Sequence, residues 1–355
     1  MSSVHDTVEP DLDGASVDAL QQTHRTEIDR LRTLVPELPK PSQTYPFHDD
    51  IFLLRYVLSF STAAKAAGPL RETLAWRKEP AVASMLEKCA DGGKAWMETP
   101  LMQTMAKYQV AGVHDCKRDG SPFVIIRPGL GNQDKLFDSM TYDEMHMAHF
   151  AYREIAMRSC DEITRRTRVV AKQTLVFDMS GLRFALMMDR RGQKVHQPVS
   201  KASSNYFPQL QSKFVMMNAP TWISVVMNLM TKIMPKRNME KMALCPCKNT
   251  SKGDMRKCPF ASKHLLPEKT PRLIGGQLAD DDASIHPSLT GALLAQDGED
   301  GGGAQWVTVT VPRQAQVERV VEVPMPGARV LWSLKLADRG IRYSAELLRV
   351  GGHFS

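Results

Sequence analysis

Four side chains that can bind a metal lie within a twenty-residue segment of the chain: Cys245, Cys247, Cys258 and His264. Thiolate and imidazole are the usual ligands of structural zinc. Such sites normally use two C-x₂₋₄-C or H-x₃₋₅-H arms, however, and the C-x-C spacing strains chelation by both sulfurs. The pattern leaves three alternatives open: a zinc site, a labile redox pair, and loop cysteines with no binding role.

Two other patterns could carry chemistry. His146 and His149 are one helical turn apart, which suits haem or metal ligation but also a plain pair on a helix surface. Gly129 and Gly131 follow an apolar run as in a dinucleotide-binding loop, yet Asp134 stands where the third glycine belongs. The sequence has no G-x-S-x-G, Walker or H-E-x-x-H motif, and no nucleophile with a convincing base. We therefore expect a protein without enzyme activity.

The segment 221–234 predicts an unusually apolar helix. Apolar residues recur there at helical spacing, and Ile223, Met227 and Met234 widen the apolar stripe. A methionine-rich wall adapts to irregular apolar partners such as an acyl chain, although a fully buried core helix has the same pattern. The residues expected to face a ligand are Trp222, Val225, Val226, Leu229, Met230 and Ile233.

Positive charge is concentrated after this helix. Between Asn228 and Lys263 there are nine Lys or Arg and two acids, while the whole chain has a net charge of +7. Bases beside an apolar helix favour an anionic membrane surface, and the lack of interleaved aromatics argues against nucleic acid. A solvated charged face is the alternative. The basic patch expected to dock on membranes consists of Lys232, Lys236, Arg237, Lys248, Lys252, Arg256 and Lys257.

Composition places the chain among ordinary globular proteins. Its 355 residues are 43% hydrophobic and 24% charged, which suits about two domains. The acidic N-terminus does not resemble a signal peptide, and the scattered cysteines do not resemble a disulfide framework. We therefore expect a cytoplasmic protein with reduced cysteines.

Alternation of apolar strands and helices predicts an α/β fold. PFVIIRPG, TLVFDMSG and KFVMMNAP have the character of buried strands, and a long helix precedes the second of them. In the N-terminal part, Ser61 or Thr62 and Pro69 are expected to mark helix starts. The expected parts are a polar leader (1–48), a helical lobe (49–100), the α/β domain (101–278), an acidic and glycine-rich linker (279–303) and an all-β tail (304–355).

Several motifs in this order resemble the CRAL-TRIO lipid-binding domain. They are LLRYVLSFSTAAKAAGPLRETLAWRKE, DGSPFVIIRPG, VFDMSG, SNYFPQLQSKFVMMNAP and LLPEKTPRLIGG. The resemblance implies a helical N-terminal lobe and a bowl with a mixed β-sheet floor, closed by a mobile gate helix over residues 221–234. The tail PMPGARVLWSLKLADRGIRYSAELL is similar to the opening strands of a GOLD domain, with Trp332 at the aromatic position. This tail would be a partial GOLD-like module able to bind a protein partner.

The phosphatidylinositol-transfer branch of that family also implies positions for the lipid headgroup. The corresponding residues here are Phe60, Gln209, Asn238 and Lys241, so only the lysine is retained. Losing the arginine removes a bidentate phosphate clamp, while Gln209 and Asn238 can still hydrogen-bond hydroxyl groups. The positions that contact phosphatidylcholine carry Gln173, Leu175, Val113 and Val124, which implies a more apolar pocket.

Together these features predict a lipid-binding or lipid-transfer protein involved in membrane trafficking. It would hold one phospholipid, such as a phosphatidylinositol, or another lipid, and exchange it as a peripheral protein at membranes such as those of the Golgi or endosomes. No other cofactor is expected. The alternative is a trafficking adaptor or scaffold with a vestigial pocket. Besides the gate, the residues expected to line the cavity are Val124, Ile126, Phe177, Phe214 and Met216.

Overall fold

The computed structural model describes residues 14–41, 47–187, 189–223, 240–245 and 263–294. All of these belong to one compact unit, Met1–Ala295; a second unit comprises Gln296–Ser355. The expected all-β tail and all seven residues of the basic patch therefore lie outside the described residues. None of the described helices is both long and apolar enough to cross a bilayer.

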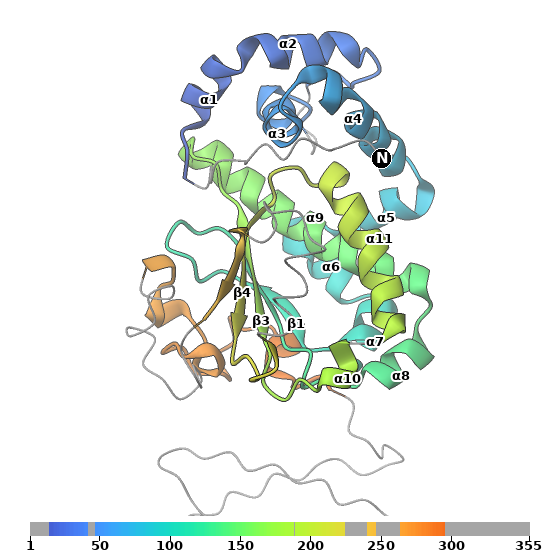
Figure 1. Cartoon of the computed structure of the whole chain (residues 1–355), viewed down its shortest axis with the longest axis vertical. Helices are drawn as coiled ribbons and strands as arrows, with labels where there is room; N and C mark the ends of the chain where they lie inside the picture. The colour runs from blue at the N-terminus through green and yellow to red at the C-terminus, as the bar shows by residue number, and fades with distance from the viewer. Residues whose placement is uncertain (1–13, 42–46, 188, 224–239, 246–262, 295–355) are drawn as a thin grey trace, which may run out of the picture. The chain divides into compact units, whose positions relative to one another are not determined.

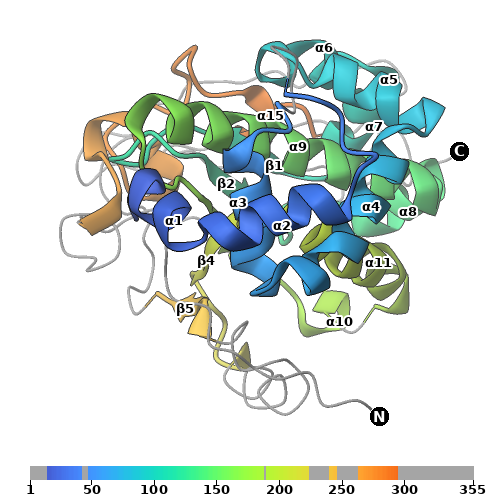
Figure 2. The same ribbon diagram turned by 90° about the horizontal axis from the view of Figure 1, so that it is seen from above.

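The N-terminal lobe is helical (Figures 1 and 2). Polar caps set its helix starts: the Asp49 carboxylate accepts from Phe52 N at 3.1 Å, and the Thr62 hydroxyl accepts from Lys65 N. Pro69 lies inside a helix and does not begin one, because the Thr62 cap starts that helix six residues earlier, at Ala63. The lobe helices are α1 (Val17–Thr23), α2 (Arg25–Leu34), α3 (Asp50–Phe60) and α4 (Ala63–Arg77).

One hydrophobic core joins these four helices. Val17, Ile28 and Leu31 are each 0% exposed and pack in the same cluster as residues of α3 and α4. The segment expected as a polar leader (1–48) therefore contains two helices that complete the core of the lobe. Figure 2 shows α2 lying across α3.

A second group of helices links the lobe to the sheet. Thr99 caps the helix Pro100–Tyr108, and its hydroxyl accepts from Met102 N. Their buried side chains, among them Met85, Met102 and Met105, pack on the central helix α9. The bounds are α5 (Pro80–Lys88), α6 (Lys94–Met97), α7 (Pro100–Tyr108), α8 (Gln133–Ser139) and α9 (Tyr142–Thr167), with a 3₁₀ turn at Asp91–Gly93.

The sheet has five strands in the order β1-β2-β3-β4-β5. β1 pairs antiparallel with β2, and the other pairs are parallel, which makes the sheet mixed as expected. The strands are β1 (Ala111–His114), β2 (Phe123–Ile126), β3 (Gln173–Asp178), β4 (Gln211–Met217) and β5 (Met242–Leu244). Helices α10 (Phe184–Met187) and α11 (Arg190–Tyr206) connect β3 to β4.

The segment after residue 263 covers one face of the sheet (Figure 1). Phe123, Ile125 and Val176 pack there against Ile285 and Leu289, all of them buried. The linker expected from residue 279 is therefore packed structure as far as residue 294, because its apolar residues cover the outer face of β1 and β2. This segment includes 3₁₀ turns at Pro267–Lys269 and Arg272–Ile274 and helix α15 (Pro287–Thr290).

Helices α9 and α11 lie on the opposite side of the sheet (Figure 1). A capping box starts α9: the Thr141 hydroxyl accepts from Glu144 N, and the Glu144 carboxylate accepts from Thr141 N at 2.8 Å. α11 packs on α9 and α4. The sheet and these two helices form the frame in which the expected ligand residues lie.

Candidate functional site

Apolar side chains cover the side of the sheet that faces α9 and α11. Because side chains alternate along a strand and neighbours in register share a face, their positions follow from the pairing. This inner face consists of two rows of cross-strand neighbours, namely Val124, Leu175, Phe214 and Met242, and then Ile126, Phe177, Met216 and Leu244. All five sheet residues expected to line a cavity are therefore on one face.

Part of the inner face is accessible, with its most exposed residue on β5. Val124 on β2 is 7% exposed, because it packs in the core formed by the α5–α9 helices. Phe177 and Phe214, on β3 and β4, are half-buried, and Leu244 on β5 is 47% exposed. A contiguous accessible apolar surface is unusual in a folded protein unless a ligand or partner covers it.

The first residues of the expected gate helix contact this surface. Ile223 is 5% exposed and clusters with Met216, Met179 and Leu182. The Trp222 ring meets Phe184 edge-on, with ring centroids 5.4 Å apart. The rest of the gate, including Val225, Val226, Leu229, Met230 and Ile233, lies outside the described residues.

The expected headgroup residues occupy the amino-terminal edge of the parallel strands. Gln209 precedes β4 and is buried, with a left-handed φ of 56° and its Nε2 donating to Ser59 Oγ at 3.2 Å. Lys241 directly precedes β5, where its carbonyl accepts from Phe214 N at 2.8 Å. Asn238 is outside the described residues. Phe60, at the position of the lost arginine, packs in the lobe core and stacks on Tyr56.

The four residues at the positions that contact phosphatidylcholine in the related branch pack against other parts of this protein. Val113, Val124 and Leu175 belong to the core beneath α9. Gln173 is buried and donates from Nε2 to Gln211 Oε1 at 2.9 Å. These side chains give this part of the inner face an apolar character.

A polar network fixes the loops at the carboxyl edge of the strands. Burial alone would raise the pKa of Asp178, but hydrogen bonds from Asn218 and Ser180 and the charge of Arg127 lower it overall. Gly129 lies in this region, and a Cβ there would come within 2.1 Å of Ser180 O. Close backbone packing thus accounts for this glycine without a bound nucleotide.

Two described groups from the candidate metal segment can be placed. Cys245 follows β5 and is half-buried, and His264 O accepts from Arg118 N at 3.0 Å. Cys247 and Cys258 are outside the described residues. Within the part of the chain that can be described, no three His, Cys, Asp or Glu side chains gather as metal ligands.

The histidine pair of α9 does not form a helix-surface pair. His149 is only 9% exposed and contacts His196 of α11, with ring centroids 5.2 Å apart. Burial, followed by the positive charges of His196 and Arg153, lowers the pKa of His149 well below its usual value. The half-buried His146 points elsewhere, to Lys194 O and Asp143.

Sequence reasoning missed three residues beside His149. Tyr152 Oη donates to Ala111 O at 3.4 Å, which places this turn of α9 over β1. Arg153 follows it and donates from Nη1 to His149 O at 2.9 Å, and His196 faces them from α11. The sequence signal was an arginine four residues after His149 on one helix. The histidine partner comes from a separate helix and has no local signal.

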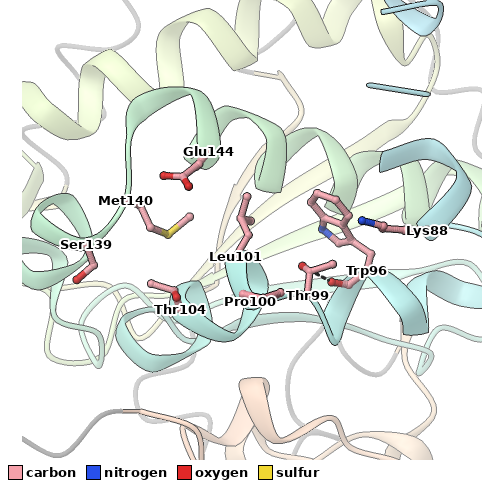
Figure 3. A pocket seen from close by; sticks show the side chains of 9 residues that line it. All are labelled: Lys88, Trp96, Thr99, Pro100, Leu101, Thr104, Ser139, Met140 and Glu144. Atoms are coloured by element: carbon pink, nitrogen blue, oxygen red, sulfur yellow. Dashed lines mark hydrogen bonds between the residues drawn. The ribbon is translucent and has the colours of Figure 1, made fainter. Parts of the chain in front are cut away.

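Away from the inner face, a pocket of about 440 Å³ lies among helices α5 to α9 (Figure 3). The Glu144 carboxylate already caps α9, and Thr99 Oγ1 donates to Trp96 O at 2.7 Å. Among the described residues, Trp96 Nε1 is buried without an acceptor. Two of the polar lining groups, those of Glu144 and Thr99, are therefore already engaged by the protein itself. Its lining consists of Lys88, Trp96, Thr99, Pro100, Leu101, Thr104, Ser139, Met140 and Glu144.

Comparison with known proteins finds a family resemblance in the part of the chain that carries the inner face. Residues 106–276 match the family model of the CRAL/TRIO domain. The chain is 24% identical over 237 residues to Protein real-time of Anopheles gambiae, covering 65% of this chain and 32% of that protein. It is also 24% identical over 219 residues to Protein real-time of Aedes aegypti, covering 60% and 31%.

The chain thus spans about a third of the length of these two curated relatives. Among solved structures, it is similar to the crystal structure of Sfh5, with a TM-score of 0.45 and 16% sequence identity. That similarity covers 64% of this chain and 80% of Sfh5.

Proposed function

We propose that this protein holds one lipid molecule against the inner face of its sheet and exchanges it at membranes. The observation that carries the proposal is the apolar inner face, whose half-buried Phe177 and Phe214 lie inside the segment that matches the CRAL/TRIO domain. CRAL/TRIO proteins bind and transfer lipids and generally do not catalyse reactions. The same general function is proposed here, without enzyme activity.

Physical chemistry supports a removable cover for this surface. Apolar area that is left in water costs about 25 cal/mol per Å², so an acyl chain against Phe177 and Phe214 is stabilised by that burial. In this proposal the gate helix 221–234 covers the bound lipid in water and moves onto the bilayer during exchange. Ile223 and Trp222 would anchor its first turn, since both already cluster with Met216.

The basic patch would hold the protein on an anionic leaflet during exchange, with each base contributing about 1 kcal/mol. We further propose that Lys241, Gln209 and Asn238 face the headgroup of a phospholipid such as a phosphatidylinositol. Lys241 supplies the positive charge for a phosphate, and the two amides supply hydrogen bonds to hydroxyl groups.

Native mass spectrometry of the purified full chain tests the proposal. We expect one co-purifying lipid per chain, released by organic extraction. Phe214→Glu would place an unpaired charge on the inner face and should expel the lipid from a folded protein. Lys213→Glu is the matched control, because the neighbouring side chain on β4 points to the opposite face.

An empty wild-type protein that also takes up no lipid from vesicles would refute lipid binding and favour the scaffold alternative. Equal lipid retention by folded Phe214→Glu and Lys213→Glu variants would show that the inner face does not hold the ligand. Circular dichroism of each variant establishes that the fold is intact before lipid is measured.

A further inference from the structure

A cluster of one arginine and two histidine side chains lies between α9 and α11. His149 and Arg153 occupy successive turns of α9, and Arg153 Nη1 donates to His149 O at 2.9 Å. His196 of α11 meets His149 with ring centroids 5.2 Å apart and ring planes at 61°. Two helices thus direct three basic side chains toward one another.

Arg153 has no acidic partner among the described residues. Its one hydrogen bond to the described protein goes to a backbone carbonyl. Two other arginines of the same helix are paired: Arg158 Nε lies 2.8 Å from Glu154, and Arg165 Nε lies 2.6 Å from Asp161. Burial lowers the pKa of Arg153 to about 10, which reflects the cost of a buried cation without a counter-charge.

The cluster lies on the side of the sheet that carries the inner face. Tyr152, the residue before Arg153, donates to Ala111 O, and Ala111 is in register with Ile126 of the inner face. His196 is exposed on α11, so the cluster can be reached by a ligand.

The cluster is also separate from the headgroup residues. Ala111 is level with Phe177 and Met216 near the carboxyl edge of the sheet, whereas Lys241 precedes β5 at the amino edge. Lys241 therefore lies roughly 10 Å from that level along the strands. The two positively charged positions are at opposite ends of the same apolar surface.

We propose that Arg153, assisted by His149 and His196, binds the oxyanion of an amphiphilic ligand, a carboxylate or a phosphate, whose apolar part lies on the inner face. This proposal rests on the lipid-binding function proposed above. The planar guanidinium suits two oxygens of one carboxylate or phosphate, and each imidazole can donate a further hydrogen bond. An anion there would supply the counter-charge that Arg153 lacks.

The test uses two lipids that differ only in their phosphate. The full chain is incubated with vesicles of phosphatidylcholine that contain equal small amounts of phosphatidic acid and diacylglycerol, and the bound lipids are extracted and quantified. The variants are Arg153→Met, which keeps the length of the side chain, and Arg153→Lys, which keeps the charge. Lys201→Met is the matched control, because this exposed lysine of α11 loses the same charge.

Wild-type protein and Lys201→Met should be enriched in phosphatidic acid over diacylglycerol. Arg153→Met should lose that preference by about tenfold or more, because charged hydrogen bonds are lost, while its diacylglycerol content is retained. Arg153→Lys should recover part of the preference. An unchanged lipid ratio in folded Arg153→Met would overturn the anion site and leave lipid binding intact.

Two further outcomes separate the proposals. A wild-type protein that carries none of these lipids refutes the lipid-binding function, and the anion site with it. Thermal stabilisation of wild type, but not of Arg153→Met, by inorganic phosphate without any lipid preference would assign the cluster to free phosphate. That result would overturn the lipid form of the inference.

Discussion

Replacing Leu31 by alanine tests whether the second helix belongs to the core of the N-terminal lobe. Leu31 is 0% exposed and packs in one cluster with side chains of α3 and α4. The substitution removes three buried carbon atoms at about 0.8 kcal/mol each, roughly 2.4 kcal/mol in transfer free energy. The cavity left behind raises the expected loss of stability to about 2.5–5 kcal/mol.

Thermal unfolding followed by far-UV circular dichroism measures this loss. For a unit of this size, the expected change is a fall in Tm of roughly 5–15 °C. Arg30→Ala is the control, because Arg30 is the preceding residue on α2 and is exposed. A surface change of that kind should alter stability by less than about 0.5 kcal/mol.

The two hypotheses about the N-terminus predict different results. If residues 1–48 were only a polar leader, Leu31→Ala and Arg30→Ala would unfold at the same temperature as the wild type. Equal Tm values for both variants would therefore refute the assignment of α2 to the core. A selective loss in Leu31→Ala would extend the lobe to include residues before 49.

Three further predictions concern pH, the gate and the membrane. Burial first, and then the charges of His196 and Arg153, lower the pKa of His149. The neutral imidazole therefore costs the fold nothing above the unfolded pKa of about 6.5, and the free energy of unfolding falls by up to about 1.4 kcal/mol for each pH unit below it. Urea unfolding of His149→Gln should show a smaller fall in this free energy between pH 7.5 and 5 than the wild type does. Val226→Asp should expel bound lipid because it places a charge against an acyl chain, whereas Asn228→Asp should retain the lipid. The bound lipid is measured by extraction from both folded variants. Lipid retention in both variants would show that the gate helix does not line the cavity. Binding to acidic liposomes should weaken steeply with salt and vanish when four bases of the basic patch become Glu, and undiminished sedimentation of that variant with liposomes would contradict membrane docking.

The strands that form the inner face could be predicted because they are continuous apolar runs. PFVIIRPG contains β2, TLVFDMSG and KFVMMNAP contain most of β3 and β4, and period-two alternation puts the expected cavity residues on one face. β1 and β5 were missed, since β1 (AGVH) is not a continuous apolar run and β5 has only three residues. Their strand conformation depends on pairing with β2 and β4.

Helices with weak local signals were harder to predict. The segment 17–38 has an amphipathic pattern, yet its many polar residues favour a leader, and only packing against α3 and α4 gives Ile28 and Leu31 a core. Pro69 favours a helix start by local rules, but Thr62 caps the helix earlier and Pro69 is accommodated in its second turn. Tertiary contacts override local preference in both cases.

The candidate anion site could not be predicted from the sequence, because its residues come from two separate helices. Arg153 and His196 are far apart in the sequence, and the packing of α11 on α9 brings them together. No spacing rule connects residues from two helices separated by a strand. The pattern of two histidines on one helix, by contrast, suggested a pairing that the structure does not form, because His146 and His149 contact different groups.

Charge pairing along α9 distinguishes two uses of arginine in one helix. On the side toward the lobe, Glu154 is fully buried and accepts from Arg77 of α4 at 2.7 Å and from Arg158 at 2.8 Å. These contacts join the lobe to α9, and removing Glu154 would take away the buried carboxylate that both arginines share, at a cost of about 3–5 kcal/mol. Arg153, on the side toward α11, has no such carboxylate among the described residues. The same rule that makes the first group structural is the reason for proposing a bound anion as the counter-charge of the second.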